Sequence, residues 1–334
     1  MSKHNHLRPV TDTLDATAFL LPAPKLADKW CHRVPIRLAM LPEEHPLHRI
    51  VHNKISGKIK HHKSPLNNLL AAYRHDPREI EKTPVTVRNP ALQDKLPFAI
   101  SIADNREDSI REAEDTSEVV QVFTDGLAID SKVGAAAILT REGNPPCALH
   151  LQLGPKSKHT VHEAELVGIL LGLHLISTEK HGSTSFALGV DNQPAIKAFQ
   201  SALRSPGHHL ARETLRIANQ VQKQKRKGNY KLTIRWTAGH EGIEGNEDID
   251  RKAKRAAKGK TSDKKTLPFY LRKRLLINPA AVKWAHHKRQ MKMWKEGWKA
   301  SVRGKYAAHL DGSTPSRKFL NSISQTELSR IDAS

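Results

Sequence analysis

Short apolar runs, rich in β-branched and aromatic residues, recur along the middle of the chain and predict the strands of a sheet. The runs are Val119–Asp125, Gly134–Thr140, Ala148–Leu153, Phe186–Asp191 and Lys231–Trp236. Short connections separate the first three runs, and the second connection is a turn sequence with Gly143, Asn144 and two prolines. Tight connections of this kind predict that the first three strands form an antiparallel meander.

The apolar positions change to a helical period between the later strands. A long helix is indicated by residues that share one apolar face, namely Leu166, Ile169, Leu170, Leu173 and Ile176. Two more helices are predicted at residues 195–203, directly after Pro194, and at residues 212–225. Asn246 would cap a last helix that ends at Ala257. The element order β-β-β-α-β-α-α-β-α predicts an α/β domain, with a mixed five-stranded sheet and helices on both faces.

The flanking parts of the chain have a different composition. Residues 1–117 are rich in proline and carry only short stretches of helical character, so we expect a weakly folded, partly disordered connector. Residues 118–260 are expected to be the compact domain. Residues 261–334 are expected to be a basic helical extension, in which Trp284, Met291, Trp294 and Trp298 recur near helical spacing and favour packing over base stacking.

The charge of the chain points to a polyanionic partner. Its 334 residues include 55 Lys or Arg and 34 Asp or Glu, a formal net charge of +21, which suggests nucleic acid or an anionic membrane. No apolar run approaches the roughly 20 residues of a membrane span, and residues 1–9 do not resemble a signal peptide, so we expect neither membrane insertion nor secretion. Cys31 and Cys147 lack a pairing pattern, which fits an intracellular location in the nucleus or cytoplasm, and no Cys/His spacing matches a zinc site.

Four carboxylates stand where an α/β fold can gather them at one rim of its sheet. Asp125 and Asp191 end predicted strands, while Glu165 and Asp250 lie in the first turns of predicted helices. On so basic a protein, an acidic cluster indicates bound divalent metal ions and a polyanionic substrate. Oxygen ligands of this kind suit Mg²⁺. Without metal, repulsion among the carboxylates would raise at least one pKa.

Each carboxylate also has an ordinary structural interpretation. Asp125 precedes a glycine and would suit a turn, Asp191 would suit a helix cap, and Glu165 would suit a solvated helix surface.

Neighbouring acids compete for the same roles. Glu163 is an alternative to Glu165, and Glu247 and Asp248 are alternatives to Asp250. An acidic first turn stabilises a helix through its dipole, which explains Glu247 and Asp248 without a metal.

The four carboxylates lie in local motifs that, in this order and on this strand pattern, resemble type 1 ribonuclease H. The motifs are Val122–Gly126, Glu163–Leu166, Leu188–Asn192 and Gly245–Asp250, with the loop Thr237–Gly242 before the last. The carboxylates are 40, 26 and 59 residues apart. The resemblance covers about residues 119–258.

The resemblance implies an endonuclease that hydrolyses the RNA strand of an RNA–DNA hybrid with two Mg²⁺ or Mn²⁺ ions. Asp125 would bridge both ions, Glu165 and Asp191 would hold the second, and Asp250 would hold the first. His240 would shuttle a proton or ease product release, although by itself it would pass for an ordinary loop histidine. The implied partner is the hybrid, whose phosphates would contact basic segments such as residues 223–227 and the chain after residue 251.

The flanks resemble the connector that follows the polymerase in fungal non-LTR retrotransposon polyproteins. The similar segments are residues 36–38, 41–47, 63–66 and 316–319, together with the segment of Trp294 and Trp298. The chain has no Tyr-x-Asp-Asp polymerase motif. The resemblance therefore implies a ribonuclease H portion of a retroelement, separated from its polymerase.

Two departures from the family pattern keep other functions open. Leu127 stands where a small polar residue is common, and His159–His162 stand where asparagines often contact the substrate. The competing hypothesis is therefore a catalytically inactive nucleic-acid-binding relic of the same fold. A third hypothesis is a related nuclease or integrase of the same broad fold. The glycine-histidine loop before the last acid argues against this hypothesis.

Overall fold

The computed structural model describes residues 11–56, 65–84, 96–114, 120–179, 185–199, 206–224, 230–238, 244–310 and 312–316. These residues divide into two compact units. One, here called the α/β unit, contains the described residues of 36–63 and 75–282, and the other, the helical unit, contains those of 1–35, 64–74 and 283–334.

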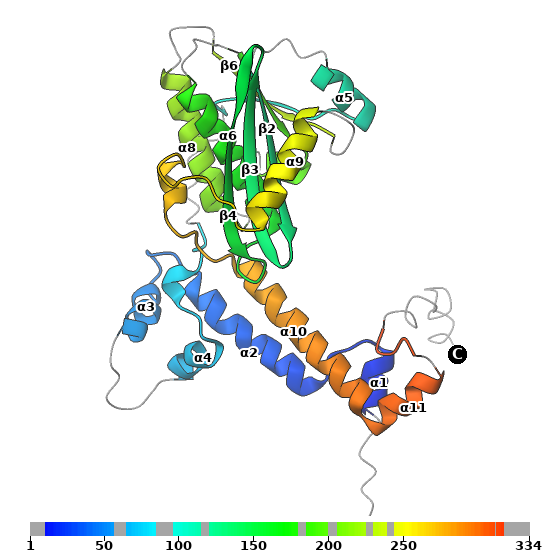
Figure 1. Ribbon diagram of the computed structural model, residues 1–334. Helices are drawn as coiled ribbons and strands as arrows, with labels where there is room; N and C mark the ends of the chain where they lie inside the picture. The colour runs from blue at the N-terminus through cyan, green and yellow to red at the C-terminus, as the bar shows by residue number, and fades with distance from the viewer. Residues whose placement is uncertain are drawn as a thin grey trace, which may run out of the picture. The chain divides into compact units, whose positions relative to one another are not determined.

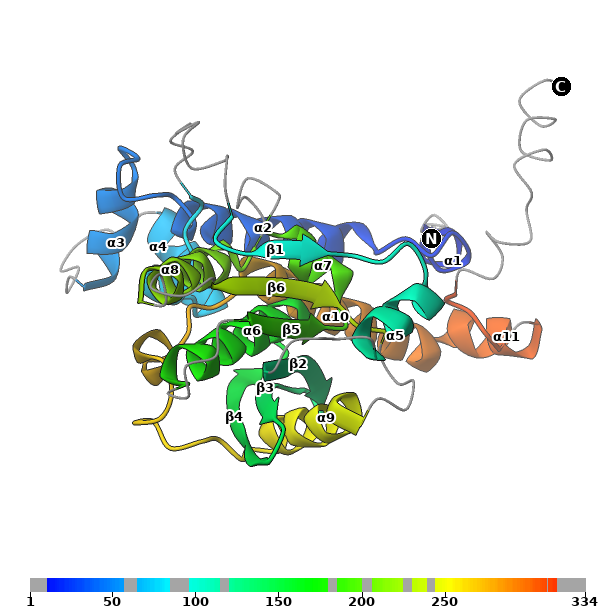
Figure 2. The ribbon, with the colours of Figure 1, turned by 90° about the horizontal axis from the view of Figure 1, so that it is seen from above.

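A mixed sheet forms the centre of the α/β unit, with strand order β1-β6-β5-β2-β3-β4 (Figures 1 and 2). The strands are β1 (Ala99–Ser101), β2 (Val120–Ile129), β3 (Lys132–Arg141), β4 (Asn144–Pro155), β5 (Ser185–Val190) and β6 (Lys231–Trp236). β2, β3 and β4 pair antiparallel, which confirms the predicted meander. The pairs β2–β5, β5–β6 and β6–β1 are parallel.

The sheet has six strands, so the expected number of five is wrong by one. β1 comes from the segment expected to be a weakly folded connector, and it pairs residue by residue with β6, from Ala99 opposite Thr233 to Ser101 opposite Arg235. Phe98, just before it, is buried in the core with its ring centroid 5.6 Å from that of Phe199. A strand of three residues is too short to show a period of two, so the pattern of apolar positions did not predict it.

Helices cover both faces of the sheet, as Figures 1 and 2 show. On one face lie α6 (Val161–Thr178) and α8 (His208–Gln224), whose apolar side chains share the main core with Val122 and Leu188. On the other face α9 (Glu244–Ala257) packs Ile249 and Ala253 against Phe123. Neighbouring residues of β2 thus serve opposite cores, as the pleat of a strand requires.

Among the described helices, α6 has the length and hydropathy to cross a membrane, but 72% of that window is buried inside the protein. Burial of this kind is expected of a core helix that is apolar all round. The remaining helices of the sheet region are α5 (Arg106–Glu114) and the short α7 (Gln193–Lys197). α9 begins at Glu244, so Asn246 lies inside the helix and the expected cap at that residue is wrong.

Segments that precede and follow the sheet along the sequence complete the α/β unit. Before β1 lie α3 (His48–Ser56) and the 3₁₀ helix η1 (Pro77–Glu79), and after α9 lies η3 (Phe269–Arg272). The Ser262 hydroxyl accepts a hydrogen bond from the backbone N–H of His150, and the Thr261 hydroxyl accepts one from Gln152, both on β4. Leu271 is buried in the main core.

The buried Glu81 joins the connector to the start of α8. Its carboxylate accepts hydrogen bonds of 2.9 and 3.0 Å from the backbone N–H of Gly207, and its Oε1 lies 2.8 Å from Nδ1 of both His208 and His209. Burial by itself would raise the pKa of Glu81, but the histidine and backbone hydrogen bonds prevail and lower it to about 2. The connector is therefore held by a charged carboxylate at a helix N-terminus.

The helical unit is built from α1 (Thr11–Thr17), α4 (Pro65–Tyr73), α11 (Val302–Leu310) and parts of α2 (Ala23–Ala39) and α10 (Pro279–Ala300). The imidazoles of His32 on α2 and His286 on α10 stack with centroids 3.8 Å apart. Trp294 and Trp298 are both 5% exposed, and the Trp294 ring contacts Phe19, so these two tryptophans pack as expected.

Candidate active site

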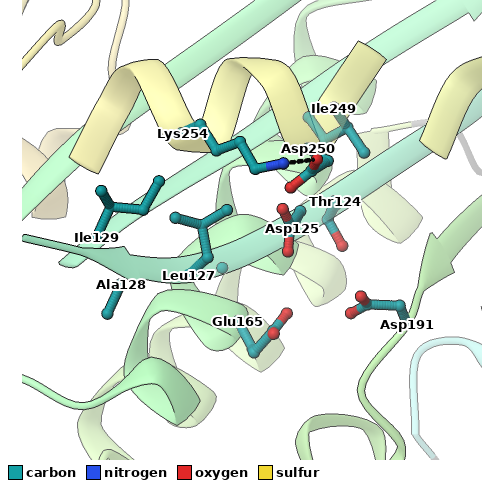
Figure 3. Close-up of a pocket in the computed structure, with 11 residues that line it drawn as sticks. Thr124, Asp125, Leu127, Ala128, Ile129, Glu165, Asp191, Ile249, Asp250 and Lys254 are labelled. Carbon is teal, nitrogen blue, oxygen red and sulfur yellow. Dashed lines mark hydrogen bonds and ion pairs between the residues drawn. The ribbon is translucent and has the colours of Figure 1, made fainter. Parts of the chain in front are cut away.

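Asp125, Glu165 and Asp191 converge on one pocket and are here called the carboxylate cluster. Each offers an oxygen that lies within 4.8 Å of the others. Asp250 and Lys254 also line the pocket, whose volume is about 440 Å³. Figure 3 shows the carboxylates directed toward a common space, with the Lys254 amino group reaching Asp250. Four segments that are distant in sequence thus supply the acids.

Asp125 lies in the middle of β2, so the expectation that it ends a strand is wrong. β2 continues to Ile129 because its pairing with β3 continues, with Asp125 opposite Ala136. The parallel pairing with β5, however, stops at Thr124 opposite Val190. Asp125 therefore stands at the point where β5 leaves the sheet, and one side of β2 opens into the pocket.

Glu165 is positioned by the first turn of α6. Thr160 caps this helix, and Glu163 completes a capping box with hydrogen bonds to the backbone N–H and hydroxyl of Thr160. Glu163 is fully buried there and does not line the pocket. Gly126 lets the helix approach β2, since a Cβ at that residue would lie 2.3 Å from the backbone N of Glu165.

Asp191 follows the last residue of β5 and faces the other two carboxylates. The helix cap at this place is Asn192, whose side chain accepts a hydrogen bond from the backbone N–H of Ala195. The Asn192 side chain also hydrogen-bonds Glu165. The main-chain oxygen of Asp191 accepts a hydrogen bond of 3.1 Å from the Trp236 indole, which ties the end of β5 to β6. Asp191 is therefore held by its backbone while its side chain faces the pocket.

Asp250 enters the pocket from α9, where the adjacent Ile249 is buried against the sheet. Its carboxylate forms an ion pair with Lys254, one turn further along the helix. Asp248 instead pairs with Arg251 at 3.3 Å and lies outside the pocket lining. A cation bound at Asp250 would meet the like charge of Lys254, so its binding requires the ammonium group to move away.

Burial and mutual repulsion raise the pKa values of the two buried carboxylates. Burial, followed by the charges of Asp191 and Asp250, raises the pKa of Asp125 to about 7. Burial, followed by the charges of Asp191 and Asp125, raises the pKa of Glu165 to about 10. A cation in the pocket would favour the ionised forms, because an opposite charge lowers the pKa of a carboxyl group.

The donor set fits a hard divalent cation. All the atoms that could bind a metal ion are carboxylate oxygens, and Glu165 Oε2 is buried without a hydrogen-bond partner among the described residues. Mg²⁺ prefers oxygen ligands and keeps several of its waters, so a few carboxylates and an open pocket are sufficient. A buried acceptor without a partner costs free energy, which a bound ion would recover.

Some site residues differ from expectation or lie outside the described residues. His240 belongs to the latter group, and its catalytic role stays a prediction. Leu127 lines the pocket and packs against the core under α9, so its apolar side chain has a structural use. Sequence reasoning missed Lys254 and Asn192. The spacing of four residues from Asp250 to Lys254 is the signal that would have found the ion pair.

Comparisons with known proteins give one family model and several similar solved structures. Residues 117–258 match the family model described as RNase H. The solved structure of RNase H1 from the archaeon Halobacterium salinarum is similar, with 16% identity, 42% of this chain and 98% of that chain covered, and a TM-score of 0.32. The structure of LC11-RNase H1 in complex with an RNA/DNA hybrid is similar with 15% identity, 42% of this chain and 96% of that chain covered, and a TM-score of 0.32. The solution structure of the PFV RNase H domain is similar with 17% identity, 43% of this chain and 96% of that chain covered, and a TM-score of 0.33. A search of curated proteins finds no match.

The matched region contains five of the six strands, the carboxylate cluster and Asp250. Its mixed sheet, with helices packed on both faces, is the RNase H-like α/β fold expected from the sequence. Residues 117–258 are therefore an RNase H domain.

Proposed function

We propose that the protein is a metal-dependent endonuclease that hydrolyses the RNA strand of RNA–DNA hybrids. The observation that carries the proposal is the convergence of Asp125, Glu165 and Asp191 within 4.8 Å, beside Asp250 in an open pocket. Acids packed so closely repel one another, and such a site is maintained at a cost in stability unless cations use it. The hybrid in the LC11-RNase H1 structure supports this choice of substrate.

The chain's own groups would hold two Mg²⁺ or Mn²⁺ ions and orient the substrate. Asp125 would contact both ions, Glu165 and Asp191 one of them, and Asp250 the other. When bound, two such ions supply an activated water and stabilise charge on the attacking and leaving oxygens. The backbone of β2 and the capped helix α6 hold Asp125 and Glu165 in place before substrate arrives, so little reorganisation is needed.

Basic side chains near α9 would contact the phosphates of the hybrid. Burial lowers the pKa of His150 on β4, and the charges of Lys252, Arg255 and Lys260 lower it further, so all three cations lie near this strand. Arg255 and Lys260 are exposed. Phosphate contacts of this kind position a nucleic acid without reading its sequence.

The test is cleavage of a labelled RNA–DNA hybrid with Mg²⁺ or Mn²⁺, beside RNA duplex, DNA duplex and single-strand controls. The expected result is metal-dependent cutting of the RNA strand of the hybrid alone. Asp125→Asn should abolish cutting and retain binding. Asp248→Asn is the matched control, because Asp248 lies on the same helix as Asp250 but outside the pocket lining, and it should cut normally.

Two outcomes would contradict the proposal. Cutting by Asp125→Asn at the wild-type rate would exclude the carboxylate mechanism. Hybrid binding without cutting by folded wild-type protein would favour an inactive nucleic-acid-binding relic, a function to which the ion pair of Lys254 with Asp250 lends support.

We further infer that the chain derives from a non-LTR retrotransposon. The support is the resemblance of residues 36–38, 41–47 and 63–66 to the connector of fungal retrotransposon polyproteins. In such an element the activity would remove template RNA after reverse transcription. A search for the same connector beside polymerase sequences in the source genome would test the inference, and its absence from all of them would contradict it.

A further inference from the structure

The helical unit carries a strong excess of positive charge. Its described residues include 12 Lys or Arg and 4 Asp or Glu. α10 alone has six Lys or Arg and one acid, Glu296. None of the four carboxylates of the pocket belongs to this unit, so they do not balance its charge. An excess of this size attracts a polyanion.

Two of its tryptophans are exposed, in contrast to the two that pack in its core. Trp30 on α2 is 50% exposed and Trp284 on α10 is 47% exposed, whereas Trp294 and Trp298 are each 5% exposed. Leaving half of an indole in water forgoes the large burial energy of a tryptophan. The exposure of Trp284 departs from the packing expected from the sequence, and about half of each indole surface is accessible to a ligand.

Each exposed indole has a cation over its ring. The Arg33 guanidinium lies 4.9 Å from the centroid of Trp30, and the Lys288 ammonium lies 5.0 Å from that of Trp284. Lys292 stands one further helical turn along the same face of α10, where its 75% exposed side chain forms a solvent-exposed ion pair of 3.7 Å with Glu296. Each helix thus presents one exposed ring together with at least one cation.

The two sets of residues lie on neighbouring helices. The stacked imidazoles of His32 and His286 fix α2 against α10. His287, three residues after Trp284, is close enough to Lys29 and Arg33 of α2 for their charges to lower its pKa, in addition to burial. The cations of α2 and the exposed face of α10 therefore belong to one region of the helical unit.

We propose that this region, here called the tryptophan surface and defined by Trp30, Arg33, Trp284, Lys288 and Lys292, binds single-stranded nucleic acid. Unpaired bases stack on the two indoles, and the cations contact the backbone phosphates. Aromatic side chains in a positively charged groove or face are the general device for holding single strands, because every base has a face to stack. The bases of a duplex are already stacked on one another, so a duplex would use the charges alone.

The experiment measures binding of a fluorescein-labelled oligothymidylate to the full chain by anisotropy. DNA contains no RNA strand to cut, so failure of the proposed cleavage function would leave this measurement unaffected. Trp284→Ala and Trp30→Ala should each weaken binding by between about fivefold and about a hundredfold, the range for loss of one stacked base. Trp284→Leu should weaken it similarly, because leucine keeps apolar contacts but offers no ring.

Tyr306→Ala is the matched control, since Tyr306 is an aromatic residue of the same unit with 75% exposure and lies outside the tryptophan surface. It should bind like the wild type. Lys288→Gln should lower the magnitude of the salt slope, log Kd against log salt concentration, by about 0.7, the value for one lost phosphate contact on a single strand. Circular dichroism of each variant checks that the helices remain folded.

Three results would overturn the proposal. The first is unchanged oligothymidylate binding in folded Trp284→Leu together with Trp30→Ala. The second is equal binding of a DNA duplex and of the single strand, with no effect of the tryptophan variants, which would indicate charge alone. The third is absence of oligonucleotide binding together with tryptophan-dependent binding to phosphatidylserine vesicles, which would assign the surface to a membrane.

Discussion

Replacing Asp125 with asparagine should stabilise the metal-free protein at neutral pH while abolishing its proposed activity. Asp125 is 9% exposed, and its pKa is raised from 3.8 to about 7, first by burial and then by Asp191 and Asp250. A carboxyl group whose pKa is raised by folding favours the folded state while protonated. That contribution is complete below pH 3.8 and is lost as the pH rises to about 7.

The size of the effect follows from the shift. One pKa unit corresponds to about 1.36 kcal/mol, so the shift of Asp125 amounts to at most about 4 kcal/mol above pH 7. An asparagine side chain has nearly the same shape and does not ionise, so the variant escapes this loss. The difference in unfolding free energy between variant and wild type should therefore be small at pH 4 and grow to roughly 2–4 kcal/mol at pH 8.

Urea unfolding followed by circular dichroism, in EDTA and at a series of pH values, measures this difference directly. Added Mg²⁺ should then stabilise the wild type, by about 2.7 kcal/mol at one hundred times its Kd, and stabilise Asp125→Asn much less. Asp248→Asn is the control and should stay within about 0.5 kcal/mol of the wild type at every pH. If the difference in unfolding free energy between Asp125→Asn and wild type does not change with pH, the explanation that burial and repulsion raise the pKa of Asp125 is refuted.

Three other substitutions test separate parts of the structure. Gly126→Ala places a Cβ against the backbone of Glu165, and we expect a loss of stability of about 1–3 kcal/mol and slower cleavage, measured by urea unfolding and hybrid cutting. Lys254→Gln removes the ion pair to Asp250, so half-maximal metal binding in calorimetry should need less Mg²⁺, and an unchanged requirement would contradict competition between the ammonium and the cation. Glu81→Gln removes a charged acceptor whose pKa is about 2, so its destabilisation of about 3 kcal/mol should be largest above pH 4.5 and fade as the pH falls toward 2 in unfolding experiments.

The sequence predicted most of the domain because its apolar periods are strong. The meander, the long helix α6 and the last strand all lie where their patterns indicate. The convergence of Asp125, Glu165 and Asp191 could also be predicted, because an α/β fold gathers residues of neighbouring strands and of the following helix at one edge of its sheet, even though Asp125 lies inside its strand and not at its end.

Other features depend on contacts that no local pattern encodes. β1 is a strand only because β6 offers it backbone partners, and three residues cannot show a period. Asp125 lies inside a strand because the pairing on its two sides ends at different residues. The choice between Glu163 and Glu165 was open in the sequence, and the geometry separates them, since the capping box at Thr160 engages the first and leaves the second for the pocket.

The hydrogen bonds at the two edges of the sheet determine the smallest fragment that should behave as a soluble domain. A fragment of residues 117–258 would lack β1, which covers β6, and would lack Thr261 and Ser262, which hydrogen-bond the outer strand β4. Both outer strands would then present unpaired backbone groups, which are templates for association with other chains. The residue range that matches the family model is thus shorter than the range needed to cover both outer strands of the sheet. A fragment that begins near residue 75 and ends near residue 282 keeps both protections, together with Glu81 and its partners.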